Sequence, residues 1–443
     1  MLLERTFQRR IGCQHTSVKL YMTRTLYICY FGLREPLVQT QVLPYLREIR
    51  KAGIEISLLT FEPKDGRNSN KERADRSTEF EKIRNELELE GIEWNWLTYH
   101  KRFSVAATAY DILAGTFFVW NKLRREHIDV LHGRVHVPTL MGAIARKFSS
   151  QKPKLLFDIR GFFPEEYTDA GRWRDNGWLY RLAKRVERWL YSVSDGFVVL
   201  TETARNVLFP ESFRTGFDKA GRPVEVIPCC IDESRFGQIS QSSQQKIRSD
   251  LELTNRFVIV HTGSIGGLYL TNEIAVLLGK WRRLRRDTFA LFLTQSDPKI
   301  IAHLLEREGF GKGDFLITKV HPGKVPNYLA VSHVGISLVK AGYATISRSP
   351  TKLPEYLAVG LPVVSNAGVG DVDEQLISDG TGTILNELNI ASYEVAFDEV
   401  LRLLQNPELG DICRRSASRR FSLKSIGGPR YRRIYSRLIG DIK

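Results

Sequence analysis

The sequence has no long hydrophobic run and few cysteines. Its longest apolar stretches, such as Ile112 to Trp120, fall well short of the roughly 20 residues that a membrane-spanning helix needs. Its five cysteines show no CxxC spacing, which fits a reducing compartment better than a disulfide framework. We therefore expect a cytoplasmic protein that neither spans a membrane nor depends on disulfide bonds.

Several catalytic signatures are also missing. The sequence contains no HExxH, no four-ligand spacing of Cys and His, no GxSxG elbow and no GxxxxGK[ST] loop. The first two absences argue against zinc hydrolysis, the third against a serine esterase, and the fourth against an ATPase or GTPase.

Acidic residues are outnumbered by basic ones. The chain has 65 Lys and Arg against 50 Asp and Glu, a formal net charge of +15. Such a charge attracts nucleic acid, phospholipid head groups or phosphorylated substrates. The arginines at Arg282 to Arg286 and Arg414 to Arg433 keep a nucleic-acid-binding protein as an alternative, although no recognised binding module accompanies them.

Short β-rich runs alternate with helical patterns along most of the chain, which is typical of parallel sheets with helices on both faces. The predicted strands are Leu26 to Phe31, Ile54 to Phe61, Ile92 to Leu97, Val130 to His132, Lys154 to Ile159, Gly196 to Leu200, Phe257 to Thr262, Phe289 to Thr294, Asp314 to Lys319, Val334 to Val339, Pro362 to Asn366 and Gly382 to Leu385. Helical patterns between them include residues 38–51 and 71–90. The alternation pauses at Phe209 to Pro228, a stretch rich in Gly, Pro and charge, which indicates a domain boundary.

The sequence therefore predicts an α/β fold with two doubly wound domains in series. We expect residues 1–23 to be an N-terminal extension, 24–222 and 223–410 to be two Rossmann-like domains, and 411–443 to be helices that pack back on the first domain. In open α/β sheets ligands bind outside the carboxyl ends of the strands. The residues that end strands are therefore the candidates for function.

The segment SPTKLPEYLAVGLPVVS, from Ser349 to Ser365, carries the strongest chemical signal. It predicts a loop with Lys352, a helix with Glu355 near its start, and Gly360 at the helix end before an apolar strand. A carboxylate in this place can accept two hydrogen bonds from a ribose diol, and a lysine can balance phosphate charge. The alternative is that Glu355 only complements the helix dipole and that Lys352 is solvated.

A glycine-rich turn, TGSIGG from Thr262 to Gly267, follows a predicted strand and precedes a helix that begins near Leu270. Gly263 and Gly266 could bring backbone amides to a diphosphate at the helix N-terminus. A tight connection without a ligand is the equally weighted alternative.

These segments resemble the donor-site signatures of glycosyltransferase family 4, also called group 1, whose retaining enzymes have the GT-B fold. Further matches follow in the family's order along the chain, in GLREPLVQTQVLPYL from Gly32, DVLH from Asp129, DIRG from Asp158 and IPCCID from Ile227. The resemblance covers most of residues 25 to 420. It implies two facing Rossmann-like domains, an acceptor domain followed by a donor domain.

The resemblance implies a nucleotide-sugar donor held by Gly263, Ser264, Gly266, Arg348, Thr351, Lys352 and Glu355. It implies retention of configuration with no metal and no cofactor, since amides and cations stabilise the leaving group. The sequence departs from the family pattern twice. Ser347 occupies the position of a second glutamate, and Leu268 to Thr271 replace the usual Arg and Lys after the glycine turn.

Polar residues also end the predicted strands of the first domain. We expect His132 and Arg134, together with Ser347, to act near the transferred sugar, and Gln39, Asp158, Arg160 and Glu165 to contact the acceptor. For His132 a structural histidine with satisfied hydrogen bonds is an open alternative, and for His136 it is the favoured one.

The DxD pattern of Asp371 and Asp373 invites comparison with metal-binding glycosyltransferases of the other large fold. Because it follows Gly368 and Gly370 in a two-domain pattern, we expect an aspartate here to cap a helix and predict no metal site.

The sequence thus predicts a retaining, metal-independent glycosyltransferase, hexosyltransferase-like, that acts on a glycan, lipid-linked or other cell-envelope acceptor. Another GT-B nucleotide-sugar enzyme, such as an epimerase or a sugar-phosphate synthase, is the nearest alternative. The net charge suggests peripheral contact with the inner face of a membrane. The base, the sugar, the acceptor and the linkage are not encoded in patterns of this kind.

Overall fold

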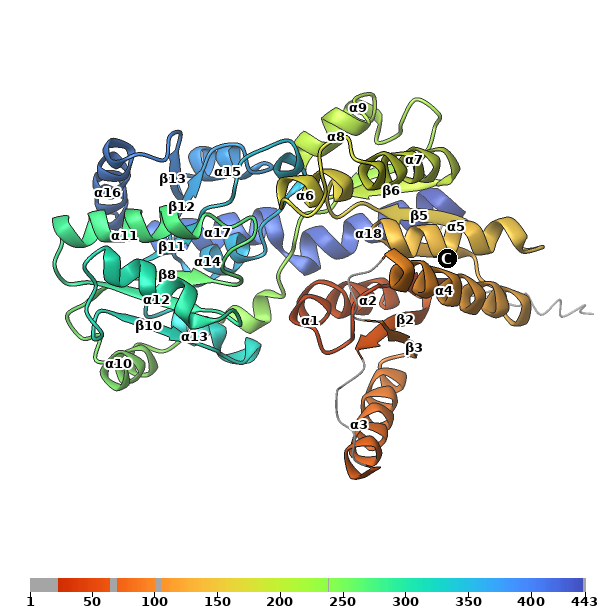
Figure 1. Cartoon of the computed structure of the whole chain (residues 1–443), viewed down its shortest axis with the longest axis horizontal. Helices are drawn as coiled ribbons and strands as arrows, with labels where there is room; N and C mark the ends of the chain where they lie inside the picture. Colours follow the sequence, from red (N-terminus) through yellow and green to blue (C-terminus); the bar gives the residue numbers. More distant parts are fainter. Residues whose placement is uncertain (1–22, 64–69, 101–104, 238, 441–443) are drawn as a thin grey trace, which may run out of the picture.

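The computed structural model describes residues 23–63, 70–100, 105–237 and 239–440. These residues form two α/β domains that lie side by side along the long axis of the molecule (Figure 1). Each domain is built on a parallel sheet with helices around it. The predicted fold of two Rossmann-like domains is confirmed.

The first sheet has seven parallel strands in the order β3-β2-β1-β4-β5-β6-β7. They are β1 (Arg24–Ile28), β2 (Glu55–Pro63), β3 (Ile92–Tyr99), β4 (Val130–Arg134), β5 (Lys154–Asp158), β6 (Gly196–Val199) and β7 (Val224–Val226). The helices of this domain are α1 (Pro36–Gln41), α2 (Leu43–Arg50), α3 (Asn70–Leu89), α4 (Val105–Arg125), α5 (His136–Phe148), α6 (Phe163–Asp169), α7 (Trp178–Val193), α8 (Glu202–Leu208) and α9 (Ser212–Thr215).

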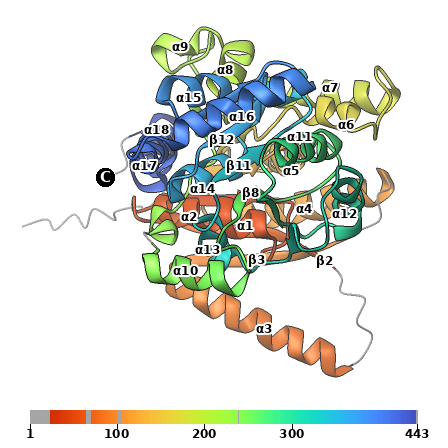
Figure 2. The ribbon, with the colours of Figure 1, turned by 90° about the vertical axis from the view of Figure 1, so that its left-hand side faces the viewer.

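Both faces of the first sheet are covered, which is why its strands are almost continuously apolar. Helices α1, α2 and α3 pack on one face, against side chains such as Tyr27 and Leu58. Helices α4, α5 and α7 pack on the other, against Leu26 and Phe157. In both views α3 extends away from the body of the domain (Figure 1 and Figure 2).

The second sheet has six parallel strands in the order β10-β9-β8-β11-β12-β13. They are β8 (Phe257–Thr262), β9 (Thr288–Leu293), β10 (Phe315–Thr318), β11 (Val334–Ser337), β12 (Val363–Asn366) and β13 (Gly382–Leu385). The helices here are η1 (Glu233–Phe236), α10 (Gln241–Asp250), α11 (Thr271–Leu284), α12 (Pro298–Arg307), η2 (Pro322–Lys324), α13 (Val325–Leu329), η3 (Ala344–Ser347), α14 (Lys352–Val359), α15 (Val372–Asp379), α16 (Ile390–Leu404) and α17 (Leu409–Phe421).

The chain crosses between the domains twice, and the two crossings are hydrogen-bonded to each other. The amide of Ile231 donates to the Phe421 carbonyl at 2.8 Å, and the amide of Leu423 donates to the Ile231 carbonyl at 2.9 Å. After the second crossing a π-helical turn, η4 (Leu423–Gly427), leads into α18 (Gly428–Ile439), which lies on the first domain (Figure 1). The C-terminal helix therefore belongs to the first domain's core although the chain reaches it last.

The structure differs from the expected boundaries in three places. The boundary at residue 222 falls before β7, which pairs with β6 and completes the first sheet. The division at residue 411 falls inside α17, because α17 packs on α14 and only the chain after Ser422 returns to the first domain. The helix expected over residues 38–51 is two helices, because Val42 leaves the helical conformation just before Pro44.

Each predicted strand is present, with ends that differ by a few residues. Within the described residues no helix is long and apolar enough to cross a membrane.

Candidate active site

Helix α14 is fixed at the carboxyl ends of β8 and β11 by one buried side chain. The hydroxyl of Tyr356 accepts a hydrogen bond from the Thr262 amide at 2.8 Å and donates to the Ile336 carbonyl at 3.3 Å. Gly360 ends the helix with a left-handed φ of 91°, as the sequence predicts. This anchoring places the first turn of α14, which carries Lys352 and Glu355, beside the glycine turn after β8.

Lys352 is a buried lysine that forms no ion pair with a carboxylate of the described residues. Its Nζ lies 4.2 Å from the centre of the Tyr269 ring and 3.4 Å from Nε2 of His261. A Cβ added to Gly263 would lie 3.8 Å from the same Nζ, so lysine and glycine turn adjoin each other. Burial lowers the pKa of Lys352 to about 7, and Glu355 opposes this only in part. The ammonium therefore lacks the anion that its position calls for.

Glu355 is partly exposed and forms no hydrogen bond or ion pair with any described residue. Burial raises the pKa of Glu355 to about 7, against the opposing charges of Arg235 and Lys352. Arg235 lies on η1, which packs against α14, and it donates to the Pro322 carbonyl at 3.2 Å. Arg235 is not among the predicted site residues, although its position shortly after the IPCCID segment could have indicated it.

The structure corrects the expected use of the glycine amides. The amide of Gly263 donates to the Leu293 carbonyl at 2.9 Å, and that of Gly266 donates to the Thr271 hydroxyl at 2.8 Å. Both amides are therefore already used inside the protein. Gly263 and Gly266 have φ angles of 95° and 81°, so their role is to let the backbone turn where other residues would be strained.

Other amides of the turn remain available. Ser264 is exposed, and neither its amide nor that of Gly267 donates to another described residue. Tyr269 and Thr271 belong to the stretch that stands in place of the family's Arg and Lys, and they hold the turn together. Thr271 accepts from Gly266, and the Tyr269 ring covers Lys352. These residues therefore stabilise the turn, and Lys352 is the side chain beside the turn that can carry a positive charge.

Ser347 and Arg348 join the two domains. The Ser347 hydroxyl accepts a hydrogen bond from the Phe162 amide at 3.1 Å and donates to the Ala344 carbonyl at 2.7 Å. Arg348 forms an ion pair with Glu166 at 3.2 Å. The Ser347 hydroxyl is engaged in this contact, which differs from the catalytic role expected of it.

Thr351 lies at the N-cap position of α14, and its side chain makes no capping hydrogen bond. It is partly exposed and stands directly before Lys352. Its hydroxyl is therefore available beside the lysine, as the resemblance implies.

Asp371 caps a helix, but in the other domain. Its carboxylate accepts hydrogen bonds from the amides of Glu202 and Thr203 at 2.7 and 3.0 Å, at the start of α8. Asp373 instead accepts from the Gly368 amide at 2.9 Å. Among the described residues no group of three or more His, Cys, Asp and Glu is placed to hold a metal ion.

The strand-end residues of the first domain form a closed, charged cluster. Asp158 is fully buried, 2.9 Å from Arg160 and 3.8 Å from Arg134. Tyr431 of α18 donates to Asp158 at 3.0 Å, and Tyr435 lies 2.9 Å from Nδ1 of His132. Helix α18 therefore covers this cluster and helps to exclude it from solvent.

The charge states of the cluster follow from its pairing. Burial acts to raise the pKa of Asp158, but Arg160, His132 and Arg134 outweigh it and hold that pKa well below its ordinary value. Burial lowers the pKa of His132, and Asp158 opposes this only in part, so the imidazole is neutral at pH 7. Asp158 and Arg160 are thus engaged with each other and with α18, which corrects the expectation that they contact the acceptor.

The remaining acceptor candidates also have partners within the protein. Glu165 pairs with Lys184 at 3.0 Å, and Gln39 is exposed and donates to the Leu33 carbonyl at 2.7 Å. His136 is buried 3.1 Å from Glu187, which fits the structural role favoured for it. Arg134 is buried in the cluster described above, away from solvent.

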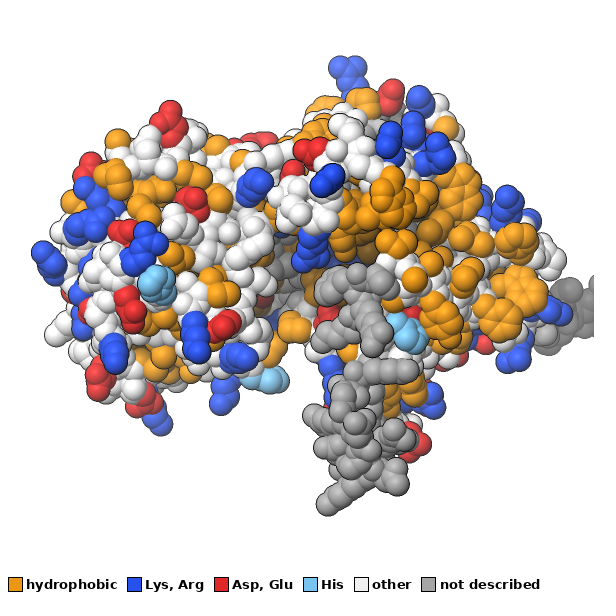
Figure 3. All heavy atoms as spheres, in the orientation of Figure 1, with side chains coloured by type: hydrophobic (Ala, Val, Ile, Leu, Met, Phe, Trp, Pro, Cys, Tyr) orange, Lys and Arg blue, Asp and Glu red, His pale blue; other side chains and the backbone are white. Residues whose placement is uncertain are grey.

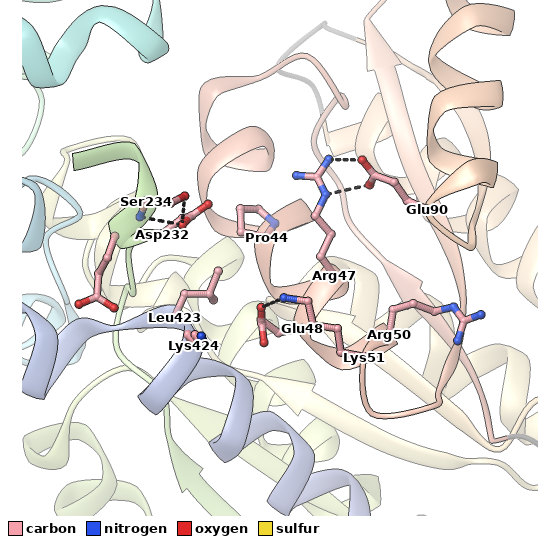
Figure 4. A pocket seen from close by; sticks show the side chains of 11 residues that line it. Pro44, Arg47, Glu48, Arg50, Lys51, Glu90, Asp232, Ser234, Leu423 and Lys424 are labelled. Atoms are coloured by element: carbon pink, nitrogen blue, oxygen red, sulfur yellow. Dashed lines mark hydrogen bonds and ion pairs between the residues drawn. The ribbon is translucent and has the colours of Figure 1, made fainter. Parts of the chain in front are cut away.

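A cavity of about 620 Å³ lies elsewhere, between α2 and the domain crossings (Figure 4). Four of its charged side chains pair with one another: Arg47 with Glu90 at 2.8 Å, and Lys51 with Glu48 at 2.6 Å. None of the residues predicted to bind donor or acceptor lines it. The candidate site is therefore the edge formed by Lys352, Glu355 and the glycine turn, and not this cavity.

The arginine clusters that suggested nucleic-acid binding are largely neutralised. Arg419 and Arg420 pair with Asp379, and Arg433 pairs with Glu225 at 3.4 Å. Arg282 pairs with Asp314 at 2.6 Å. These arginines hold helices together, so they no longer support the nucleic-acid alternative.

Comparisons with known proteins show which family model and which solved structures the chain resembles. The model of a family described as Glycosyltransferase Family 4 matches residues 38–235. Comparison with curated protein sequences gives no match. Among solved structures, a glycosyltransferase from Rickettsia africae ESF-5 has a TM-score of 0.66 at 13% identity, covering 95% of this chain and 100% of that one.

Two further structures are similar over nearly the whole chain. Anabaena Alr3699/HepE in complex with UDP-glucose has a TM-score of 0.64 at 15% identity, with 93% and 99% covered. WaaG, a glycosyltransferase involved in lipopolysaccharide biosynthesis, has a TM-score of 0.58 at 14% identity, with 89% and 95% covered.

Two parallel sheets joined in this way match the GT-B fold of these glycosyltransferase structures. The family model supports glycosyltransferase family 4 over the first domain, and the solved structures show the GT-B fold over nearly the whole chain. The fold that the resemblance implies is confirmed, and the family model agrees with the resemblance over residues 38–235.

Proposed function

We propose that the protein is a retaining glycosyltransferase that transfers a sugar from a nucleotide-sugar donor bound at Lys352, Glu355 and the glycine turn. The observation that carries the proposal is the unpartnered pair of charges on α14. A buried ammonium without an anion and a carboxylate without a donor stand one helical turn apart. A nucleoside diphosphate supplies both missing partners, phosphate oxygens for the lysine and ribose hydroxyls for the glutamate.

The chemistry follows from these positions. The bond between C1 of the sugar and the diphosphate breaks while the acceptor hydroxyl oxygen bonds to C1, and the hydroxyl proton passes to the leaving diphosphate. Negative charge grows on the diphosphate as the bond breaks. Lys352, the free amides of Ser264 and Gly267, and the start of α14 are the groups that stabilise this charge.

We propose that no metal ion is needed for this step. Lys352 provides a full positive charge at the diphosphate once the ligand's own charge restores its proton. Arg348, which pairs with Glu166 in the ligand-free protein, is a second cation within the same loop. Retention of configuration and transfer of a hexose are proposals that rest on the family resemblance.

For the donor base, uridine is the first candidate to test. Alr3699/HepE has a structure with UDP-glucose, and WaaG is described as acting in lipopolysaccharide biosynthesis. We propose by analogy a nucleotide-sugar donor and an acceptor of the cell envelope, lipid-linked or otherwise anionic. The analogy is one of fold, so the acceptor needs its own experiment.

A thermal-shift screen against nucleoside diphosphates and their sugars tests the proposal. A ligand at 100 times its dissociation constant should stabilise the protein by about 2.7 kcal/mol. Glu355→Ala should abolish the shift, because the ribose then loses charge-assisted bonds of about 1.5–3 kcal/mol each. Glu306→Ala, an exposed glutamate on α12 of the same domain, is the matched control and should leave the shift intact.

An unchanged shift in Glu355→Ala would contradict the proposed site. An epimerase or a sugar-phosphate synthase would give the same shifts, so product analysis with the best donor must follow. Appearance of a free nucleoside diphosphate together with a glycosylated acceptor supports transfer, whereas an isomerised nucleotide sugar supports an epimerase.

A further inference from the structure

One face of the first domain exposes apolar side chains where a soluble helix would carry polar ones. On α4, Tyr110, Leu113 and Phe117 are 58%, 68% and 64% exposed. Their spacing of three and four residues puts them on one side of the helix, the side turned away from the sheet. Isolated exposed hydrophobic residues are ordinary, but an apolar stripe on the solvent side of a helix needs a partner.

The stripe continues onto the neighbouring helices. Helix α5 packs between α4 and α7, and all three cover the same sheet face. Phe148 at the end of α5 is 71% exposed, and Trp178 and Leu182 on α7 are 62% and 47% exposed. Figure 3 shows hydrophobic side chains gathered over this part of the molecule, with Lys and Arg at the margins. We call the outward surface of α4, α5 and α7 the apolar face.

Exposed charges on the apolar face have one sign. The three helices are described over their full lengths, and their acidic residues, Asp111 and Glu187, are both buried. The exposed charged residues of these helices are Arg124, Arg125, Lys147, Arg181, Arg185 and Arg188. None of the six forms an ion pair with a described residue, whereas the arginines of α17 and α18 largely do.

This combination fits one class of partner. An apolar surface rimmed by unpaired cations matches the interface of an anionic lipid bilayer, where side chains enter the acyl boundary and arginines meet the head groups. Trp178 suits this boundary because the indole has an apolar body and a polar N–H. A second copy of the chain fits less well, because a two-fold contact through this face would oppose like charges.

We propose that the apolar face docks the protein on the surface of an anionic phospholipid membrane. Helix α6 connects this surface to the donor side, since it packs on η3 of the second domain and its Glu166 pairs with Arg348. Docking would therefore bring the contact between α6 and η3 toward the bilayer surface, on the side from which a membrane-borne acceptor could approach. The docking surface itself goes beyond the proposed function, and only its role in presenting the acceptor rests on that function.

Co-sedimentation with vesicles tests the proposal. We expect the protein to bind vesicles of phosphatidylcholine mixed with phosphatidylglycerol, more weakly at high salt, and to bind pure phosphatidylcholine poorly. Leu113→Gln/Phe117→Gln should lower the partition coefficient at least tenfold, since each withdrawn side chain of this size contributes about a factor of ten. Arg181→Gln/Arg185→Gln should lower it about tenfold at low salt.

Matched variants outside the apolar face separate binding by this surface from nonspecific adsorption. Ile377→Gln/Val395→Gln changes two side chains that are 68% and 58% exposed, and Arg415→Gln/Arg432→Gln removes two exposed charges outside the apolar face. Both controls should bind vesicles like the parent. Equal loss of binding in the controls, or absence of binding by the parent, would overturn the proposal.

Two further outcomes would also overturn it. If sedimentation shows a dimer that Leu113→Gln/Phe117→Gln dissociates, without vesicle binding, the face is a contact between copies. If the same variant abolishes salt-dependent binding to duplex DNA, the partner is nucleic acid. The thermal shift with UDP is measured on every variant: a retained shift with lost vesicle binding supports the docking surface, and vesicle binding without any shift counts against the proposed function alone.

Discussion

Charged residues lie at the carboxyl ends of the strands in both domains, and we call these two groups the first edge and the second edge. The two edges carry similar residues but differ in whether the charges are paired. At the first edge, Asp158 is bonded to Arg160 and Tyr431, and its neighbours are covered by α18. At the second edge, Lys352 lies against the Tyr269 ring and the His261 imidazole, and among the described residues neither Lys352 nor Glu355 forms an ion pair. Buried charge that is paired supports a fold, and buried charge that is left unpaired indicates a place for a ligand.

The two edges favour opposite protonation forms: the first favours the charged form of Asp158, and the second favours the neutral forms of Lys352 and Glu355. Pairing holds the pKa of Asp158 well below its ordinary value, so the carboxylate stays ionised around neutral pH. Burial without a partner brings the pKa values of Lys352 and Glu355 from opposite sides to about 7. The second edge is therefore the one whose charge a bound diphosphate and ribose would change.

Breaking the first edge should have the largest effect on stability. Asp158→Asn leaves Arg134 and Arg160 buried without their counter-ion, which costs about 3–5 kcal/mol of unfolding free energy. Denaturant unfolding of parent and variant measures the difference. Should this variant fail to fold, Tyr435→Phe, which removes the hydroxyl shared with Thr25 and His132, should cost about 1–3 kcal/mol. A loss below about 1 kcal/mol in Asp158→Asn would show that the cluster is not sealed as described.

Removing charge from the second edge should stabilise the ligand-free protein. The pKa of Lys352 is about 7 when folded and 10.5 ordinarily, so between these values the unfolded chain binds one more proton and stability rises with pH. Lys352→Met removes that dependence. We expect the variant to be more stable than the parent at pH 6, with an advantage that shrinks steadily between pH 7 and pH 10.5. An advantage that does not change with pH would mean that the lysine keeps its charge in the folded protein.

Glu355 gives the complementary pH dependence. Its pKa is about 7 when folded and 4.5 ordinarily, so between these values the folded protein binds the extra proton and stability falls as pH rises. Glu355→Gln should flatten this segment of the stability curve. Glu306→Gln, on the exposed side of α12, should leave it unchanged.

The smallest effect is expected at the contact between the edges. Glu166→Gln removes the pair with Arg348, both of whose side chains are about a quarter exposed, and should cost about 0.2–1 kcal/mol. It also frees Arg348, so affinity for a nucleoside diphosphate should stay the same or rise. A marked fall in affinity would show that Glu166 supports the donor site instead of only closing the domains.

The sequence predicted the second edge better than the first, for a physical reason. The positions of Lys352 and Gly360 follow from local order along one segment, in which a loop, a helix and a strand succeed each other. The fate of Asp158 and His132 depends on Tyr431 and Tyr435, which lie 273 and 303 residues further along the chain. No periodicity near Asp158 reports a helix that returns from the far end of the chain.

The same limit applies to the glycine turn and to Asp371. The spacing of Gly263 and Gly266 predicted a turn after a strand, and the turn is present. Which amides remain free depends on Thr271 and Leu293, and which helix Asp371 caps depends on how the domains meet. Fold and local geometry were therefore predictable from the sequence, whereas partners across the domains were not.

The most direct test of the central claim is the uptake of protons when UDP binds, measured by calorimetry in buffers of different ionisation enthalpy. About one pH unit above 7, Lys352 is mostly neutral and Glu355 mostly ionised in the free protein, so binding should take up close to one proton per site. Lys352→Met should abolish this uptake, and Lys299→Met, an exposed lysine of the same domain, should keep it. Binding of UDP without proton uptake, or with the same uptake in Lys352→Met, would contradict the assignment of the diphosphate to Lys352.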